Sequence, residues 1–200
     1  SHHGVLDLVL LTKVPGMKVF APSSYQELQQ MLHDAFEYDD GPCAIRWAKT
    51  AAPHVEWSEV GNGLSARLVR SAGDEDTQVC ILGAGKMLSV AVESAERLTS
   101  QGVSTTVWDP RLISPLDQDM IKNAAEHSLV VTIEDGFRQG GFGSLVRDSL
   151  AEISPNTQVQ VLGVPVDHHP HGNADSLLAS FGLDADGVVA TVNQVLNSGK

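Results

Sequence analysis

Two groups of side chains in this sequence have types and spacing suited to chemistry. Residues 1–4 read SHHG, which is typical of the end of a catalytic motif, although adjacent histidines at a terminus also fit the remnant of a purification tag. Glu134 and Asp135 follow an apolar run and could act as paired carboxylates in acid/base catalysis. The alternative for this pair is a polar exit from a buried strand.

Two glycine-containing segments could bind a cofactor or an anion. Residues 83–85 (GAG) lie between an expected strand and an expected helix, where a dinucleotide fingerprint would begin, but Leu88 takes the third glycine position. A tight turn is the simpler interpretation. Residues 140–144 (GGFGS) open an expected helix and could present backbone N–H groups to an anion. The same glycines also fit close backbone packing at a helix N-terminus.

The densest group of histidines is DHHPH at residues 167–171. Imidazole and carboxylate groups are suitable zinc ligands. Adjacent residues of an extended segment point in opposite directions, however, and Pro170 stiffens the chain. We therefore expect a loop at a domain or subunit boundary here, and we predict no metal ligands in this chain.

The composition excludes several classes of protein. Hydrophobic residues make up 42% and charged residues 19% of the 200 residues, as in ordinary globular proteins. The net charge of -12 repels phosphate backbones and anionic lipids, so neither nucleic acid nor a membrane is an expected partner. No apolar run approaches the ~20 residues that span a bilayer. Cys43 and Cys80 lie in apolar runs that favour buried, reduced thiols, which indicates a cytoplasmic location.

Hydrophobic periodicity and turn signals predict an α/β fold. A strand at 17–21, a helix from the capping-box spacing at residues 24–27 to about Tyr38, and a strand at 43–47 form an expected parallel, right-handed β-α-β unit. Residues 50–78 lose this pattern. Strands are then expected at 79–82, 104–108, 129–133 and 159–162, and helices at 87–100, 117–127, 142–153, 174–181 and 186–196. This alternation predicts a mostly parallel sheet with helices on both faces.

The opening residues resemble a known family. Residues 1–8 (SHHGVLDL), 14–17 (VPGM) and 21–23 (APS) are similar to the pyrimidine-binding domain of the 1-deoxy-D-xylulose 5-phosphate synthases, just after their substrate histidine. Other signatures of that family follow in their usual order: GPCAIR (41–46), DPRLISPLD (109–117), VTIED (131–135), GGFGS (140–144) and GLDA (182–185). The resemblance covers nearly all of the sequence.

The resemblance implies a domain organisation. Residues 1–50 would be the last β-α-β part of the pyrimidine-binding (second) domain, 51–78 an interdomain linker with room for a hairpin, and 79–200 a transketolase C-terminal-like (third) domain. The chain would then be the C-terminal portion of such a synthase. Two alternatives remain: part of another transketolase-like enzyme, against which residues 109–117 and 182–185 weigh, and a stand-alone, non-catalytic interaction module.

The resemblance also implies a function. The family uses thiamine diphosphate and Mg²⁺ to condense pyruvate with D-glyceraldehyde 3-phosphate, releasing CO₂, for isoprenoid precursors by the non-mevalonate route and for thiamine and pyridoxal. His2 matches the histidine that lines the substrate pocket, where an imidazole can move protons near neutral pH. Arg46 and Lys49 match positions at the aldehyde's phosphate, with Lys49 the better candidate for direct contact. The alternative for Arg46 is a strand-end salt bridge.

This sequence departs from the family after Arg46. The family's aromatic residue, proline, basic residue and glycine are replaced by Trp47-Ala48-Lys49-Thr50, which alters the turn that carries the lysine. The family's diphosphate- and magnesium-binding domain, its activating glutamate and the acidic residue before the substrate histidine are not in the sequence. We therefore expect no bound cofactor and no synthase activity in this chain alone, and we expect the rest of the synthase chain and a second copy in a homodimer as partners.

Overall fold

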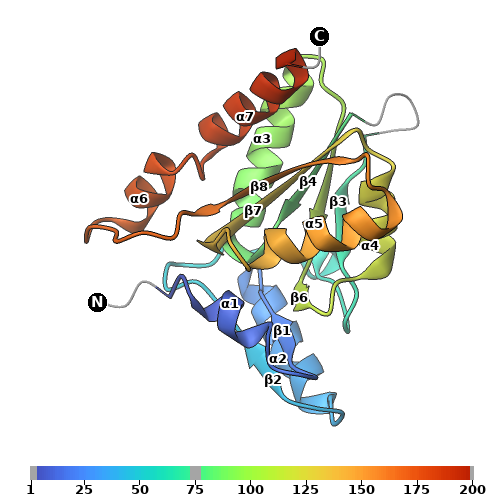
Figure 1. Ribbon diagram of the computed structural model, residues 1–200. Coiled ribbons are helices and arrows are strands. Elements are labelled where there is room, and N and C mark those ends of the chain that lie inside the picture. The colour runs from blue at the N-terminus through green and yellow to red at the C-terminus, as the bar shows by residue number, and fades with distance from the viewer. Residues whose placement is uncertain (1–3, 73–77, 199–200) are drawn as a thin grey trace.

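A computed structural model describes residues 4–72 and 78–198 of the chain (Figure 1). Its larger sheet has the strand order β3-β5-β4-β7-β8. The strands are β3 (Arg67–Arg70), β4 (Val79–Gly83), β5 (Thr105–Asp109), β7 (Leu129–Phe137) and β8 (Gln158–Val164). Strands β5, β4, β7 and β8 pair in parallel, and β3 pairs antiparallel with β5 at one edge. The predicted α/β class with a mostly parallel sheet is confirmed.

Helices cover both faces of this sheet. Helices α3 (Leu88–Ser100) and α7 (Ala185–Ser198) lie on one face, and α4 (Gln118–Ala125) and α5 (Phe142–Ile153) on the other (Figure 1). Alternate residues of a strand point to opposite faces of the sheet. Ile81 packs in the hydrophobic core under α3 and α7 (the α3/α7 core), whereas Cys80 packs in the core under α4 and α5 (the α4/α5 core). Because both faces are covered, all five residues of β4 are buried.

Residues 51–78, expected as an interdomain linker, contain a short 3₁₀ helix at Trp57–Glu59 and, at 67–70, the edge strand β3. The end of this segment therefore belongs to the larger sheet, while the proposed domain boundaries stay a prediction. A second 3₁₀ turn (Gly85–Met87) leads into α3, and helix α6 (Ala174–Ser180) follows the loop after β8.

None of the helices in the described part of the chain is long and apolar enough to cross a membrane.

The first 50 residues form a smaller sheet beneath the larger one (Figure 1). After helix α1 (Asp7–Leu11), strand β1 (Lys18–Phe20) and strand β2 (Cys43–Ile45) form this sheet, and helix α2 (Tyr25–Glu37) connects them. Strands β1 and β2 are parallel, as predicted. A third strand, β6 (Leu112–Ser114), was not predicted; it comes from far along the chain and pairs antiparallel with β1. The two sheets are therefore joined by a shared chain segment.

Helix α2 begins at Ser24, whose side chain accepts a hydrogen bond from the Glu27 backbone N–H at 3.1 Å. This half of the expected capping box is present. The Glu27 carboxylate is engaged elsewhere: it accepts from the Gly61 backbone N–H at 2.8 Å and from Arg111 Nε at 2.7 Å. A residue expected to cap its own helix instead holds two distant segments against it.

Arg111 is the centre of a buried network of charges between the two sheets. Its side chain is 1% exposed, and its Nη1 donates to the backbone carbonyls of Asn62, Gly63 and Ser65 at 2.9 to 3.1 Å. Asp109, also buried, accepts from the Arg111 backbone N–H and from Ser23 Oγ. Burial raises the pKa of Asp109 to about 6, against the lowering effect of the Ser23 hydrogen bond.

Replacing Arg111 by methionine keeps most of the side-chain volume but removes the cation that is hydrogen-bonded to the buried Glu27 carboxylate, which then keeps only the longer contact with Arg67 Nε at 3.8 Å. We expect Arg111→Met to lower the free energy of unfolding by about 3–5 kcal/mol, measured by urea denaturation. The control is Arg147→Met on the exposed face of α5, for which we expect a change within about 0.5 kcal/mol. Equal effects of the two substitutions would contradict this role for Arg111.

Candidate functional site

The predicted site residue His2 lies outside the described residues, but the chain that follows it is well anchored. The Phe137 N–H at the end of β7 donates to the Val5 carbonyl at 2.8 Å, and Arg46 Nη2 donates to the Gly4 carbonyl at 3.4 Å. Leu8 in α1 is 1% exposed and packs in the α4/α5 core. The segment leading away from His2 is therefore bound to β7, to Arg46 and to the core.

Arg46 follows β2 and connects two acidic residues. Its Nε donates to both Asp7 carboxylate oxygens at 3.1 Å, and its Nη1 donates to Asp135 Oδ1. Burial alone lowers the pKa of the guanidinium, but the charges and hydrogen bonds of Asp135 and Asp7 outweigh it, so the net pKa is raised. With its side chain 14% exposed, Arg46 makes the strand-end salt bridge considered as its alternative. Its predicted contact with substrate stays a prediction.

The glycine-rich segment at 140–144 presents its amides to an acceptor, but this acceptor is a carboxyl group of the protein itself. The backbone N–H groups of Phe142 and Gly143, at the start of α5, donate to the Glu134 carboxylate at 3.0 and 2.8 Å. A side chain at Gly141 would overlap that carboxylate, which accounts for glycine at this position. Burial raises the pKa of Glu134 to about 7, against the lowering effect of the two N–H donors.

The Glu134-Asp135 pair therefore has structural partners. Consecutive residues of a strand point to opposite sides, and here Glu134 meets the start of α5 while Asp135 meets Arg46. This arrangement favours the polar strand exit over paired acid/base catalysts. Residues 83–85 lead directly from β4 into the 3₁₀ turn before α3, which agrees with the simpler interpretation of a tight turn. Glycine is needed at 83, because a side chain there would meet Leu88 Cα at 2.8 Å.

The histidine-rich segment at 167–171 forms part of the loop between β8 and α6. His169 Nε2 lies 2.7 Å from the Pro165 carbonyl, and its ring packs 4.7 Å from the Phe181 ring. Within residues 4–72 and 78–198, no three His, Cys, Asp or Glu side chains gather so as to hold a metal ion.

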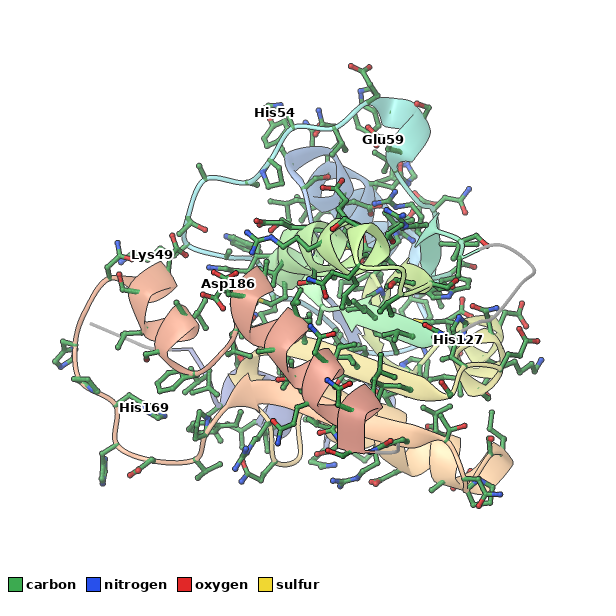
Figure 2. The ribbon with its side chains drawn as sticks, turned by 90° about the horizontal axis from the view of Figure 1, so that it is seen from above. Lys49, His54, Glu59, His127, His169 and Asp186 are labelled. Carbon is green, nitrogen blue, oxygen red and sulfur yellow. The ribbon has the colours of Figure 1, made fainter. Side chains whose placement is uncertain are left out.

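Lys49, the last predicted site residue, is exposed and lines a cavity of about 320 Å³. The same cavity is lined by Val5, by Asp135 and by residues of the loop and helix that follow β8. Figure 2 shows Lys49 and His169 on the side of the molecule where that loop and α6 lie. The structure thus brings Lys49 and the Arg46 partner Asp135 to one cavity wall, beside the segment that leads to His2.

Sequence reasoning missed Asp7 and Asp135 as the partners of Arg46. They lie 39 and 89 residues from it in the chain, so no local spacing could reveal the contact. Lys86 and His169 were likewise not associated with Lys49, although all three line the same cavity.

Comparison with known proteins identifies both parts of the chain. Residues 69–188 match the model of the transketolase C-terminal domain, and residues 1–54 match that of the transketolase pyrimidine binding domain. A 1-deoxy-D-xylulose-5-phosphate synthase of Corynebacterium glutamicum (strain R) is 37% identical over 201 residues, covering 99% of this chain and 32% of that protein. The synthase of Kocuria rhizophila is 37% identical over 191 residues, covering 92% of this chain and 29% of that protein.

A solved structure described as a split gene transketolase, inactive beta4 tetramer, superimposes with a TM-score of 0.86 at 29% identity, covering 96% of this chain and 62% of that one. The transketolase-like fold expected from the sequence is thereby confirmed. The chain spans about a third of the length of the curated relatives it matches.

The raised pKa of Glu134 predicts a specific pH dependence. The folded carboxyl keeps its proton up to about pH 7, whereas the unfolded one loses it near the ordinary value of 4.5. The folded state binds more protons in that window, so this group makes the free energy of unfolding fall as pH rises through it. Glu134→Gln removes this ionisation. The difference in free energy of unfolding between the variant and wild type should therefore shift in favour of the variant by about 2–3 kcal/mol from pH 5 to pH 8. Urea unfolding at both pH values measures this shift.

Glu152→Gln is the matched control, because Glu152 is an exposed carboxyl on α5, the helix whose first N–H groups donate to Glu134. Its difference from wild type should be the same at both pH values. A pH-independent difference for Glu134→Gln as well would contradict the prediction.

Proposed function

Because this chain belongs to the transketolase family, a family of thiamine diphosphate-dependent enzymes, we propose that it forms the C-terminal part of a 1-deoxy-D-xylulose-5-phosphate synthase. That enzyme would condense pyruvate with D-glyceraldehyde 3-phosphate and release CO₂. Its product would serve isoprenoid precursor, thiamine and pyridoxal synthesis. The observation that carries the proposal is the 37% identity to synthases of that name over 99% of this chain.

Within this function, Lys49 is the residue that contacts the phosphate of D-glyceraldehyde 3-phosphate. Its ammonium makes no ion pair with any described residue, so it is free to take a ligand anion. It also lines the cavity beside Asp135. A lysine offers a point charge rather than a bidentate fork, which suits a single phosphate oxygen.

Arg46 supports the site in a different way. Four contacts, to Asp7 twice, to Asp135 and to the Gly4 carbonyl, occupy its guanidinium. We assign it to substrate binding through these contacts, because they fix the segment that leads to His2. His2 then has the role of moving a proton at the reacting substrate, for which an imidazole is suited near neutral pH.

Thiamine diphosphate supplies the electron sink for this chemistry, and the remainder of the synthase is its proposed binding partner. Within the described residues, no three His, Cys, Asp or Glu side chains gather so as to hold a metal ion, and we propose that Mg²⁺ is bound together with the cofactor by the remainder of the synthase. We propose a cytoplasmic, homodimeric enzyme in which this chain alone is inactive. The solved neighbour supports this last point, since it is a split gene transketolase described as an inactive beta4 tetramer.

The test of the proposed function is pyruvate- and D-glyceraldehyde 3-phosphate-dependent CO₂ release. We expect none from this chain alone and clear activity when the same residues are joined to, or mixed with, the diphosphate-binding part of the enzyme. Transfer of a two-carbon unit by the complete protein from a ketose phosphate donor, xylulose 5-phosphate, to ribose 5-phosphate, with no CO₂ released, would instead indicate another transketolase-type enzyme. Absence of turnover from the complete protein with both substrate pairs would favour a non-catalytic interaction module.

Lys49→Ala in the complete enzyme should raise KM for D-glyceraldehyde 3-phosphate about tenfold, as expected for one charged hydrogen bond, while KM for pyruvate changes less than about twofold. Steady-state kinetics with each substrate varied in turn measures this. Lys122→Ala, an exposed lysine of α4 paired with Asp119, is the control and should leave both constants unchanged. A parallel rise in both KM values would show that Lys49 does not act on the phosphate.

A further inference from the structure

The cavity at Lys49 is built from several segments that are distant in the sequence. Val5 and residues 48–50 form one side, Lys86 comes from the turn before α3, and the remaining lining comes from β7, from the end of β8 and from the loop and helix that follow β8. Its volume of about 320 Å³ is at the lower end of the range for small-molecule sites. A site of this size accommodates a ligand of a few carbon atoms with one anionic group.

One part of the cavity wall is apolar. It is formed by Val5, Val164, Leu177, Leu178 and Phe181. Phe181 and Leu178 also pack against the α3/α7 core, so this wall is fixed by the fold. It offers a surface for the carbon skeleton of a ligand but nothing for an anion.

The polar side of the cavity is positively charged in a chain whose net charge is -12. It carries Lys49 and Lys86, together with His169. Lys86 is 20% exposed and, within the described residues, forms an ion pair with Asp175, which is 3.3 Å away and itself 78% exposed. A pair so open to water is weak, so the Lys86 ammonium can exchange this carboxylate for a ligand anion.

His169 has a defined tautomer in this cavity. A backbone carbonyl can only accept, so the 2.7 Å contact with Pro165 requires that Nε2 carries a hydrogen. Nδ1 is then left to accept from a ligand hydroxyl, or to donate when the ring is protonated. The acidic residue on the cavity wall, Asp135, is already neutralised by Arg46. The charge that faces a ligand is therefore positive.

We propose that this cavity binds a small phosphomonoester, with Lys86 as a second phosphate ligand beside Lys49, His169 at a ligand oxygen, and Leu177 and Phe181 against the carbon skeleton. The C-terminal segment around α6 thereby supplies part of the phosphate substrate's site. That the ester is D-glyceraldehyde 3-phosphate rests on the proposed function; the affinity for a phosphomonoester does not. One lysine offers a phosphate a single point charge instead of the two parallel hydrogen bonds of an arginine, and a second ammonium group, from Lys86, makes up for this difference.

The test is a titration of the 200-residue chain with sn-glycerol 3-phosphate, an unreactive phosphomonoester, followed by calorimetry and by the NMR signals of the His169 ring. We expect saturable binding and a shift of the His169 signals. Inorganic phosphate should bind more weakly, because it lacks the carbon skeleton, and glycerol should not bind. Equal affinity for inorganic phosphate and the ester would overturn the role of the apolar wall, and no binding of either would overturn the site.

Four variants separate ligand contact from structural support. Lys86→Gln should weaken binding of the ester about tenfold and His169→Gln about threefold, while Lys122→Gln on α4 leaves it unchanged. Asp175→Asn breaks the same ion pair as Lys86→Gln but keeps the ammonium, so binding should be retained or tightened. If Asp175→Asn weakens binding as much as Lys86→Gln, Lys86 acts only by holding α6, and the proposal fails.

This outcome is separable from that of the proposed function. Lys86-dependent binding by a protein whose complete form lacks synthase activity would leave the phosphate site standing and refute the function. Synthase activity whose KM for D-glyceraldehyde 3-phosphate is the same in Lys86→Gln and wild type would refute the phosphate role of Lys86 and leave the function standing.

Discussion

The burial of Arg111 is the constraint on which the rest of this structure depends. A guanidinium removed from water costs free energy unless it is paired and hydrogen-bonded. Here Glu27 and three backbone carbonyls of residues 62–65 accept from its Nε and Nη1, and its Nη2 lies 3.7 Å from the Asp34 carboxylate without a hydrogen bond. These acceptors come from α2 and from the segment before β3, while Arg111 itself lies between β5 and β6. One side chain therefore connects the smaller sheet, the segment before β3 and the larger sheet.

The carboxyl end of β7 organises the second half of the site. Because side chains alternate along a strand, Glu134 points to the start of α5 and Asp135 to Arg46. These adjacent carboxyl groups therefore have different partners. The first satisfies helix amides that would otherwise attract an external anion, and the second neutralises a cation beside the cavity. Together they leave Lys49 and Lys86 as the cations of the cavity wall with which a ligand can pair.

Much of the fold followed from periodicity, because buried parallel strands and amphipathic helices carry strong local patterns. Helix α5 has the predicted bounds 142–153, and β4 is one residue longer than expected. Strand β6 was missed because three residues carry no periodicity and its pairing with β1 depends on tertiary contact. Less of the site could be predicted from the sequence. Lys49 was identified by resemblance. The contacts that bring in Asp7, Asp135, Lys86 and His169 join segments far apart in the chain, and no local spacing encodes them.

The position of β6 has a consequence for biosynthesis. Strands β1 and β2 are made well before the third strand of their sheet, which consists of residues 112–114 and is directly preceded by Arg111. During translation, β1 must wait with an unpaired edge while some 90 further residues are added, at about 5–20 residues per second. For several seconds the nascent chain exposes a strand edge that invites pairing with other chains. Until β6 is made, a chaperone that covers this edge of β1 would protect the nascent chain from such pairing.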